Sequence, residues 1–239
     1  MRTLLNITFI ILVFKFSPVY SQSGDYYLSS GLTKHGQNNF AGAIADFTMA
    51  IQANPMNATP YYCRGLSKAE INDHKGAIED FTRSLNLKPL DPHAFFYRGI
   101  SNHKAGENRA AIIDFTKSAE IDPQNMETYF YRALAKHSLG DYVGAINDFN
   151  RVLEKDEFNV KFLYSRSLTK YEMRDFGGTI FDLNTVIELS PNNKDAFHFR
   201  GMAFMRSGKT VNGCADLQKA RELGDKSALD IIRDKCSVP

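Results

Sequence analysis

The chain has 239 residues, of which 43% are hydrophobic and 12% aromatic, so it can bury a continuous core and is not a disordered segment. Its formal net charge is +2, and without residues 1–21, which contain Arg2 and Lys15, it holds 27 basic and 27 acidic residues. A neutral chain has no general electrostatic affinity for nucleic acid or anionic lipid, so we expect neither as a partner.

The first residues have the layout of a secretory leader. Arg2 precedes a mostly apolar run over 4–14, and Val19-Tyr20-Ser21 offers a cleavage site before Gln22. This run is shorter than the about 20 apolar residues of a membrane-spanning helix. With Gln after the cut, the leader resembles those of exported proteins of Bacteroidota-type bacteria. We expect a signal peptide over 1–21, cleavage near Ser21, and a periplasmic or cell-surface mature chain without a membrane span. The alternative is an uncleaved anchor, because Lys15 interrupts the apolar segment.

From Gly24 onward the chain repeats itself every 34 residues. The motif Ala-Ile-x-Asp-Phe begins at Ala43, Ala77, Ala111 and Ala145, and decayed copies follow. A period of this size is typical of stacked supersecondary units, each of which buries its apolar face against its neighbours. The six units are 24–57, 58–91, 92–125, 126–159, 160–193 and 194–227.

Each unit has the pattern of two helices. Small residues in the first half, such as Gly65 and Gly99, allow close approach of a second helix, and Phe81 and Phe115 fill the space between the two. Turn residues lie in the middle of the units. Proline restricts the residue before it and cannot donate a helical N–H, so the second helix should stop near the end of the unit. The prolines at this place are Pro55, Pro89, Pro123 and Pro191.

These residues resemble the tetratricopeptide repeat, whose pattern is an aromatic residue, Leu-Gly, and then Ala, Phe and Pro at matching spacing. In place of the Leu, most units carry Arg, as in a known variant of the repeat. The resemblance implies an all-α, right-handed α-solenoid, a superhelix of six helix-turn-helix units over 24–239. A capping helix over 228–236 completes the predicted domain.

One Asp recurs in all six units beside the aromatic packing residue, and an Arg recurs in the last five. An ion next to the core needs a partner. We expect each Asp to pair with the Arg of the next unit, as Asp114 with Arg132. This pairing explains why the first unit carries no Arg, since no unit precedes it. The alternative is pairing within the unit, as Asp114 with Arg98. Either way the series is structural, and we expect no catalytic residue and no enzyme activity.

In tetratricopeptide stacks the first helices line a concave face, and the resemblance places an apolar and aromatic stripe on it. Such a groove suits a protein or peptide with apolar anchors. We therefore expect a non-catalytic interaction scaffold; the alternative is a structural homo-oligomer whose stacks self-associate. A third reading is that the stripe is partly core. The expected groove residues are Tyr62, Leu66, Phe96, Ile100, His103, Phe130, Leu134, His137, Tyr164 and Leu168.

His35, His103 and His137 share one place in their units. Neighbouring helices lie roughly 8–10 Å apart, which is long for two imidazoles to share a metal without a third ligand. We expect no metal and no cofactor. Cys214 and Cys236 lie in the last unit and the cap, where an exported chain could bridge them. The alternative is two small buried thiols.

Overall fold

The computed structural model describes residues 18–236, which form thirteen α-helices and no strand. The helices are α1 (Pro18–Gly36), α2 (Phe40–Ala53), α3 (Ala58–Glu70), α4 (His74–Leu87), α5 (Pro92–Lys104), α6 (Asn108–Ile121), α7 (Met126–Ser138), α8 (Tyr142–Leu153), α9 (Val160–Glu172), α10 (Phe176–Leu189), α11 (Lys194–Arg206), α12 (Thr210–Glu222) and α13 (Ala228–Lys235).

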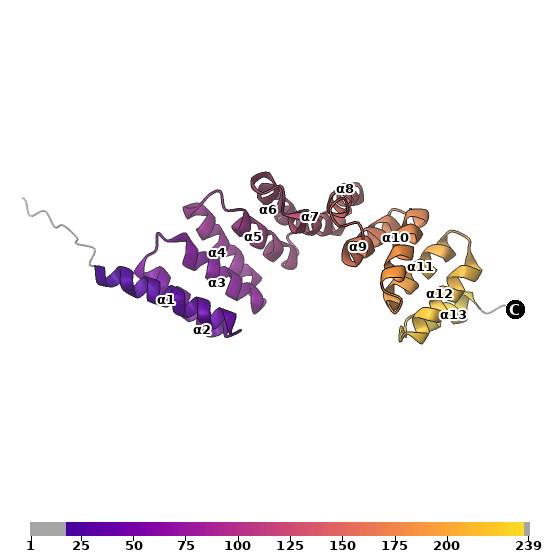
Figure 1. Cartoon of the computed structure of the whole chain (residues 1–239), viewed down its shortest axis with the longest axis horizontal. Helices are drawn as coiled ribbons and strands as arrows, with labels where there is room; N and C mark the ends of the chain where they lie inside the picture. The colour runs from indigo at the N-terminus through magenta and orange to yellow at the C-terminus, as the bar shows by residue number, and fades with distance from the viewer. Residues whose placement is uncertain (1–17, 237–239) are drawn as a thin grey trace, which may run out of the picture.

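The helices pack in consecutive pairs that stack into an arch (Figure 1). Each odd-numbered helix from α1 to α9 also contacts the next odd-numbered helix, so the odd-numbered helices form a continuous layer. In the middle of the arch, α7 and α9 lie on the inner side and α8 on the outer side. The predicted fold class, an all-helical solenoid of stacked helix pairs, is confirmed.

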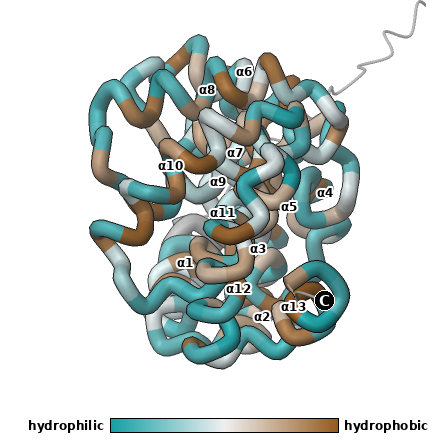
Figure 2. Tube along the Cα trace, turned by 90° about the vertical axis from the view of Figure 1, so that its right-hand side faces the viewer, coloured by the Kyte–Doolittle hydropathy of each residue, from teal (hydrophilic) through white to brown (hydrophobic). Residues whose placement is uncertain are grey.

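Local sequence sets where the helices start and stop. The N-cap Asp73, for example, accepts a hydrogen bond from the Gly76 amide, and Asn57 does the same for the Thr59 amide. The second helices α2, α4, α6 and α10 each end two residues before a proline, as predicted. Hydrophobic and hydrophilic residues are interspersed along the helices (Figure 2), so a helix can bury one side and expose the other.

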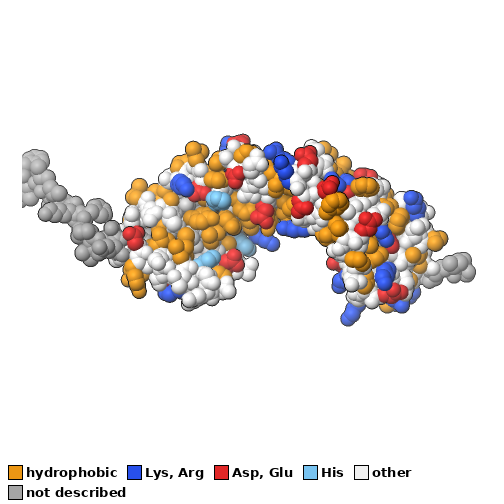
Figure 3. Space-filling model, in the orientation of Figure 1, with side chains coloured by type: hydrophobic (Ala, Val, Ile, Leu, Met, Phe, Trp, Pro, Cys, Tyr) orange, Lys and Arg blue, Asp and Glu red, His pale blue; other side chains and the backbone are white. Residues whose placement is uncertain are grey.

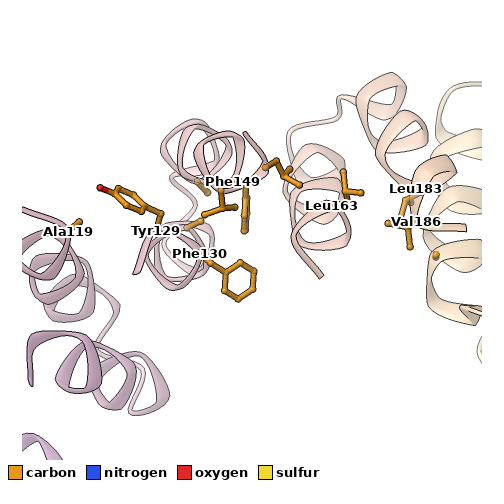
Figure 4. Close-up of a cluster of buried hydrophobic side chains, with 12 residues drawn as sticks. Ala119, Tyr129, Phe130, Phe149, Leu163, Leu183 and Val186 are labelled. Carbon is orange, nitrogen blue, oxygen red and sulfur yellow. The ribbon is translucent and has the colours of Figure 1, made fainter. Parts of the chain in front are cut away.

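The core consists of the recurring large side chains packed against the recurring small ones. Phe81 and Phe115 are fully buried, and Gly65 and Gly99 lie directly against their rings. In the centre of the chain the core runs from Ala119 past Phe149 to helix α10 (Figure 4). Its members from α10 include Val186 and Leu183, and Leu183 stands where the Phe of the motif has decayed.

The predicted pairing of each Asp with the Arg of the next unit is wrong. Arg98 Nε and Nη2 donate to the two carboxylate oxygens of Asp114 at 3.0 and 2.6 Å, within one unit. The same bidentate pair recurs in every unit from the second to the sixth. The two helices of a unit are antiparallel neighbours, so their side chains face each other directly. Asp46, in the first unit, instead pairs with Lys34 at 2.7 Å.

Each guanidinium nevertheless joins two units. Arg98 Nη1 donates to Thr82 Oγ1 at 3.0 Å, and Thr82 lies in the preceding helix pair. The equivalent acceptors for the other arginines are Thr48, Thr116, Asn150 and Asn184. The recurring Arg therefore fixes the register of a helix pair on the one before it.

The C-terminal helix α13 covers the last pair. Ile231 and Ile232 pack against Leu217 and Ala220 of α12. Cys214 and Cys236 are joined by a disulfide, which ties the end of α13 to α12. Cys63 is a free, buried thiol in the first inter-pair contact, and burial raises its pKa to about 11.

Most of the expected leader, residues 1–17, lies outside the described residues. Helix α1 begins at Pro18, so the expected cleavage point near Ser21 falls in its first turn. No helix among the described residues is long and apolar enough to cross a membrane.

Candidate functional site: the inner surface

The inner surface is the exposed face of the layer made by α1, α3, α5, α7, α9 and α11. Because these helices contact one another in series, their exposed side chains form one continuous strip along the arch. Figure 3 shows hydrophobic side chains gathered over α3 to α5, with histidines among them, and a hollow beneath the middle of the arch. Of the ten predicted groove residues, eight are half-buried: Tyr62, Leu66, Ile100, His103, Leu134, His137, Tyr164 and Leu168.

The other two, Phe96 and Phe130, are core residues. They are only 4% and 2% exposed, so our expectation that both rings face outward is wrong. Their rings contact the packing residues Phe115 and Phe149 of the same units. The predicted apolar stripe is therefore partly core at these two positions, which is the third reading that the sequence left open.

Side chains from the following unit cover the two buried rings. The Tyr131 ring lies 5.7 Å from that of Phe96, and the Phe162 ring lies 5.0 Å from that of Phe130. The Lys161 ammonium also lies over the Phe130 ring, 4.1 Å from its centroid. The curvature of the stack brings the next helix over these positions, which closes them to solvent.

The aromatic side chains that do reach the surface were missed by the sequence analysis. Tyr97 and Tyr131 directly follow the two buried phenylalanines and are half-buried. Each ring stacks on the packing residue of the preceding unit, Tyr97 on Phe81 at 6.4 Å and Tyr131 on Phe115 at 6.2 Å. The aromatic residues at this place in the third, fourth and sixth units, at positions 97, 131 and 199, were the available signal.

The tyrosines of the inner surface lie near carboxylates at the starts of the odd-numbered helices. Burial and the charge of Asp195 raise the pKa of Tyr164 to about 12. Burial and the charge of Glu127 likewise raise the pKa of Tyr131. These phenols therefore remain protonated hydrogen-bond donors at any physiological pH, next to a negative potential.

Two of the recurring histidines link neighbouring odd-numbered helices. His35 Nδ1 lies 2.9 Å from Ser67 Oγ, and His137 Nδ1 lies 3.0 Å from Thr169 Oγ1. Both hydroxyls already donate to backbone carbonyl oxygens of their own helix, so the imidazole must donate its Nδ1–H. Burial lowers the pKa of His137, although the charge of Glu172 opposes the shift. In its neutral form, the His137 ring leaves Nε2 as an acceptor.

His103, at the same place in the third unit, instead pairs with Asn108 of its own unit, through Nδ1 and Oδ1. Among residues 18–236, no group of three or more His, Cys, Asp or Glu side chains is placed to hold a metal ion. A hollow of about 820 Å³ lies at the C-terminal end of the inner surface, between α11 and α13, where Met202, Met205 and Ile231 line it.

Residues 62–125 match the tetratricopeptide repeat family. No curated protein sequence matches the chain. The structure is similar to that of YrrB, described as a tetratricopeptide repeat protein with an unusual peptide-binding site. The TM-score is 0.69 at 19% identity, over 78% of this chain and 97% of YrrB.

Two further solved structures have the same architecture. The C-terminal part of a tetratricopeptide repeat protein from Cytophaga hutchinsonii gives a TM-score of 0.72 at 18% identity, over 82% of this chain and 78% of that one. PilF of Pseudomonas aeruginosa gives 0.71 at 12% identity, over 91% of this chain and all of PilF. At these identities the likeness establishes the fold: this chain has the architecture of tetratricopeptide repeat solenoids.

Proposed function

We propose that this tetratricopeptide-type solenoid is a non-catalytic scaffold that holds a protein or peptide segment against its inner surface. The observation that carries the proposal is the strip of half-buried apolar and aromatic side chains along the odd-numbered helices. Leu66, Ile100, Leu134 and Leu168 recur there at one place in four successive units. A repeated apolar surface of this kind is typical of an interaction site. The peptide-binding site described for YrrB supports the same use of the fold.

A catalytic role finds no support in the acidic residues. The recurring carboxylates, which are the most regular polar feature of the sequence, are committed to structural ion pairs. Asp80, for instance, accepts from Arg64 at 2.6 Å and pairs with Lys68 at 2.9 Å. A carboxylate held by two cations is a poor general base, because its charge is already neutralised.

We also propose that the chain is exported, with residues 1–21 removed. The leader-like sequence and the Cys214–Cys236 disulfide support this, since disulfides persist in oxidising compartments. The mass of the intact protein recovered from its own cells tests the cleavage. A mass that still includes the first 21 residues would contradict it.

The binding proposal is tested with a displayed library of random peptides of about 12 residues, selected on the purified protein. The Leu134→Ser/Leu168→Ser variant should lose the selected peptides, because both side chains are only half-buried and lie on the inner surface. The control is Ile113→Ser/Phe181→Ser, which removes two apolar side chains that are 63% and 68% exposed on even-numbered helices. If the control loses the peptides and the inner-surface variant keeps them, the binding site lies elsewhere. Melting temperatures confirm that both variants fold.

Self-association remains the second candidate, because exposed apolar side chains also occur outside the inner surface. Phe158 and Phe181 are 60% and 68% exposed and line one hollow beside α8 and α10. Light scattering during size-exclusion chromatography measures the mass in solution. A monomer at every concentration removes this candidate, whereas a dimer lost on Phe181→Ser supports it.

A further inference from the structure

The inner surface already binds one cation of its own. The Lys161 ammonium lies 4.1 Å from the centroid of the Phe130 ring and 5.4 Å from that of Tyr131. Lys161 has no ion pair among the described residues, so the contact with the two rings is what holds it. Cation–π contacts of this geometry stabilise where the ring is shielded from water, as Phe130 is.

The 34-residue repeat presents the same aromatic pair one unit earlier without its cation. Phe96 and Tyr97 stand in the third unit where Phe130 and Tyr131 stand in the fourth, and their rings make the same edge contact at 5.2 and 5.4 Å. The position equivalent to Lys161, 34 residues earlier, is occupied by Glu127. Glu127 is exposed and has no ion-pair partner in the part of the chain that the structure describes.

A second carboxylate stands one unit after Lys161, beside a single ring, because Ser165 replaces the second aromatic residue there. Asp195 occupies the equivalent place near Tyr164, is exposed, and has no ion pair among residues 18–236. At equivalent positions of three successive units, the inner surface therefore carries the unpaired carboxylate of Glu127, the ammonium of Lys161 and the unpaired carboxylate of Asp195. Only Lys161 has a partner within the chain, the Phe130 and Tyr131 rings. The lysines at the other ends of α7 and α9 do not offset these carboxylates, because Lys136 and Lys170 are paired with Asp148 and Asp182.

We infer that the segment held on the inner surface is basic, with one Lys or Arg side chain at Glu127 and a second at Asp195. The partner cation at Glu127 lies beside the half-buried Tyr97, because Tyr131 already covers the Phe96 ring. The inference deepens the proposed function and rests on it. Charge complementarity selects the occupant, since an acidic segment would meet two unpaired carboxylates.

The fold also sets the spacing of the two basic residues. Glu127 lies on α7 and Asp195 on α11, with α9 between them, and packed helices are about 8–10 Å apart. The two carboxylates are therefore about 16–20 Å apart, which an extended chain spans in about five or six residues.

The experiment uses the random peptide library already described and the neutral variant Glu127→Gln/Asp195→Asn, which keeps the shape of both side chains. Its matched control is Glu120→Gln/Glu188→Gln, which removes two exposed carboxylates from even-numbered helices. We expect peptides selected on the parent to be enriched in Lys or Arg pairs five or six residues apart. A synthetic copy should bind the neutral variant about tenfold more weakly and the control variant unchanged. Its affinity should also fall as salt rises.

The outcomes separate this inference from the function on which it rests. If selected peptides need Leu134 and Leu168 but carry no basic pair and bind the neutral variant equally well, the inference is overturned and the scaffold proposal stands. If no selected peptide depends on the inner surface, both are overturned.

Discussion

Arg98 contacts two units at once, and its ion pair with Asp114 joins the two helices of its own unit. It holds Asp114 through two hydrogen bonds, while Asn102 Nδ2 donates a third to the same carboxylate at 2.9 Å. The carboxylate is almost fully buried and the guanidinium largely so. Ion pairs in this setting stabilise little by themselves, but leaving one charge without the other is costly.

Asp114→Ala should therefore lower the free energy of unfolding by about 3 kcal/mol or more, because it leaves the Arg98 guanidinium unpaired. Adding Arg98→Leu should restore much of the loss, since the unpaired charge is then gone. Adding Arg132→Leu should lower stability further, because it breaks the separate pair with Asp148. Urea unfolding of the three variants measures this. Rescue by Arg132→Leu would mean that the pair joins neighbouring units.

Asp46 gives the first unit its own dependence on pH. Hydrogen bonds from Lys34 and Ser30 hold the pKa of this carboxyl below its ordinary value of 3.8. A lowered pKa means that the contribution to stability is complete above the ordinary value and is lost as the pH falls through the folded-state value. The stability difference between the parent and Asp46→Asn should be constant above about pH 5 and shrink below about pH 4. Unfolding curves across that range check it; a difference that grows towards low pH would contradict the assignment.

At the scale of the helices, a glycine lies directly against an aromatic ring in each of the first three units. A Cβ built on Gly99 would lie 2.7 Å from the Phe115 ring, whose side chain is fully buried. This contact is what allows α5 and α6 to approach, and it repeats between α3 and α4.

Gly99→Ala should destabilise the protein. Alanine favours the helix by about 1 kcal/mol over glycine, but overpacking a closed core costs about 1–3 kcal/mol, so the steric term wins. Gly36→Ala is the matched control, because nothing lies within 4 Å of a Cβ at this exposed end of α1. The control should melt at the same temperature as the parent or higher. Equal melting of Gly99→Ala and the parent would show that Phe115 can move aside.

Sequence alone predicts the helix pairs well because their signals are local and recur in every unit. Caps, prolines and the Ala-Ile-x-Asp-Phe motif each lie within one helix or one turn. The sequence could not decide which Arg pairs with each Asp. Arg98 and Arg132 stand 16 and 18 residues from Asp114, so the separation along the chain favours neither. The burial of Phe96 and Phe130 was also missed. It depends on curvature, which is the sum of small rotations between units and has no single residue as its signal.

At the scale of the whole molecule, a linear stack is weakest at its ends, because a terminal pair has a neighbour on one side only. The disulfide between Cys214 and Cys236 acts at the C-terminal end. It closes a loop between residues 22 positions apart, and such a link stabilises by about 3 kcal/mol in the chain-entropy model.

Cys214→Ser/Cys236→Ser should therefore loosen α13 and leave the middle of the stack unchanged. Hydrogen exchange of the backbone amides measures this directly: we expect faster exchange over 228–236 and unchanged exchange in α5 to α8. Cys63→Ser is the control for loss of a thiol away from this end. Faster exchange throughout the chain would mean that the stack unfolds as one cooperative body.

The continuous inner layer has a mechanical consequence. Consecutive odd-numbered helices touch, and each even-numbered helix also packs on the odd-numbered helix of the next unit, so every joint between units is a side-chain contact that can shift slightly. When its ends are pulled, the arch can lengthen by small rotations shared among all units, with no helix broken, and it behaves as an elastic element. A ligand that spans α7 to α11 bridges two of these joints, the one between α7 and α9 and the one between α9 and α11. Binding should then stiffen the molecule, and tension that flattens the arch should release what it holds.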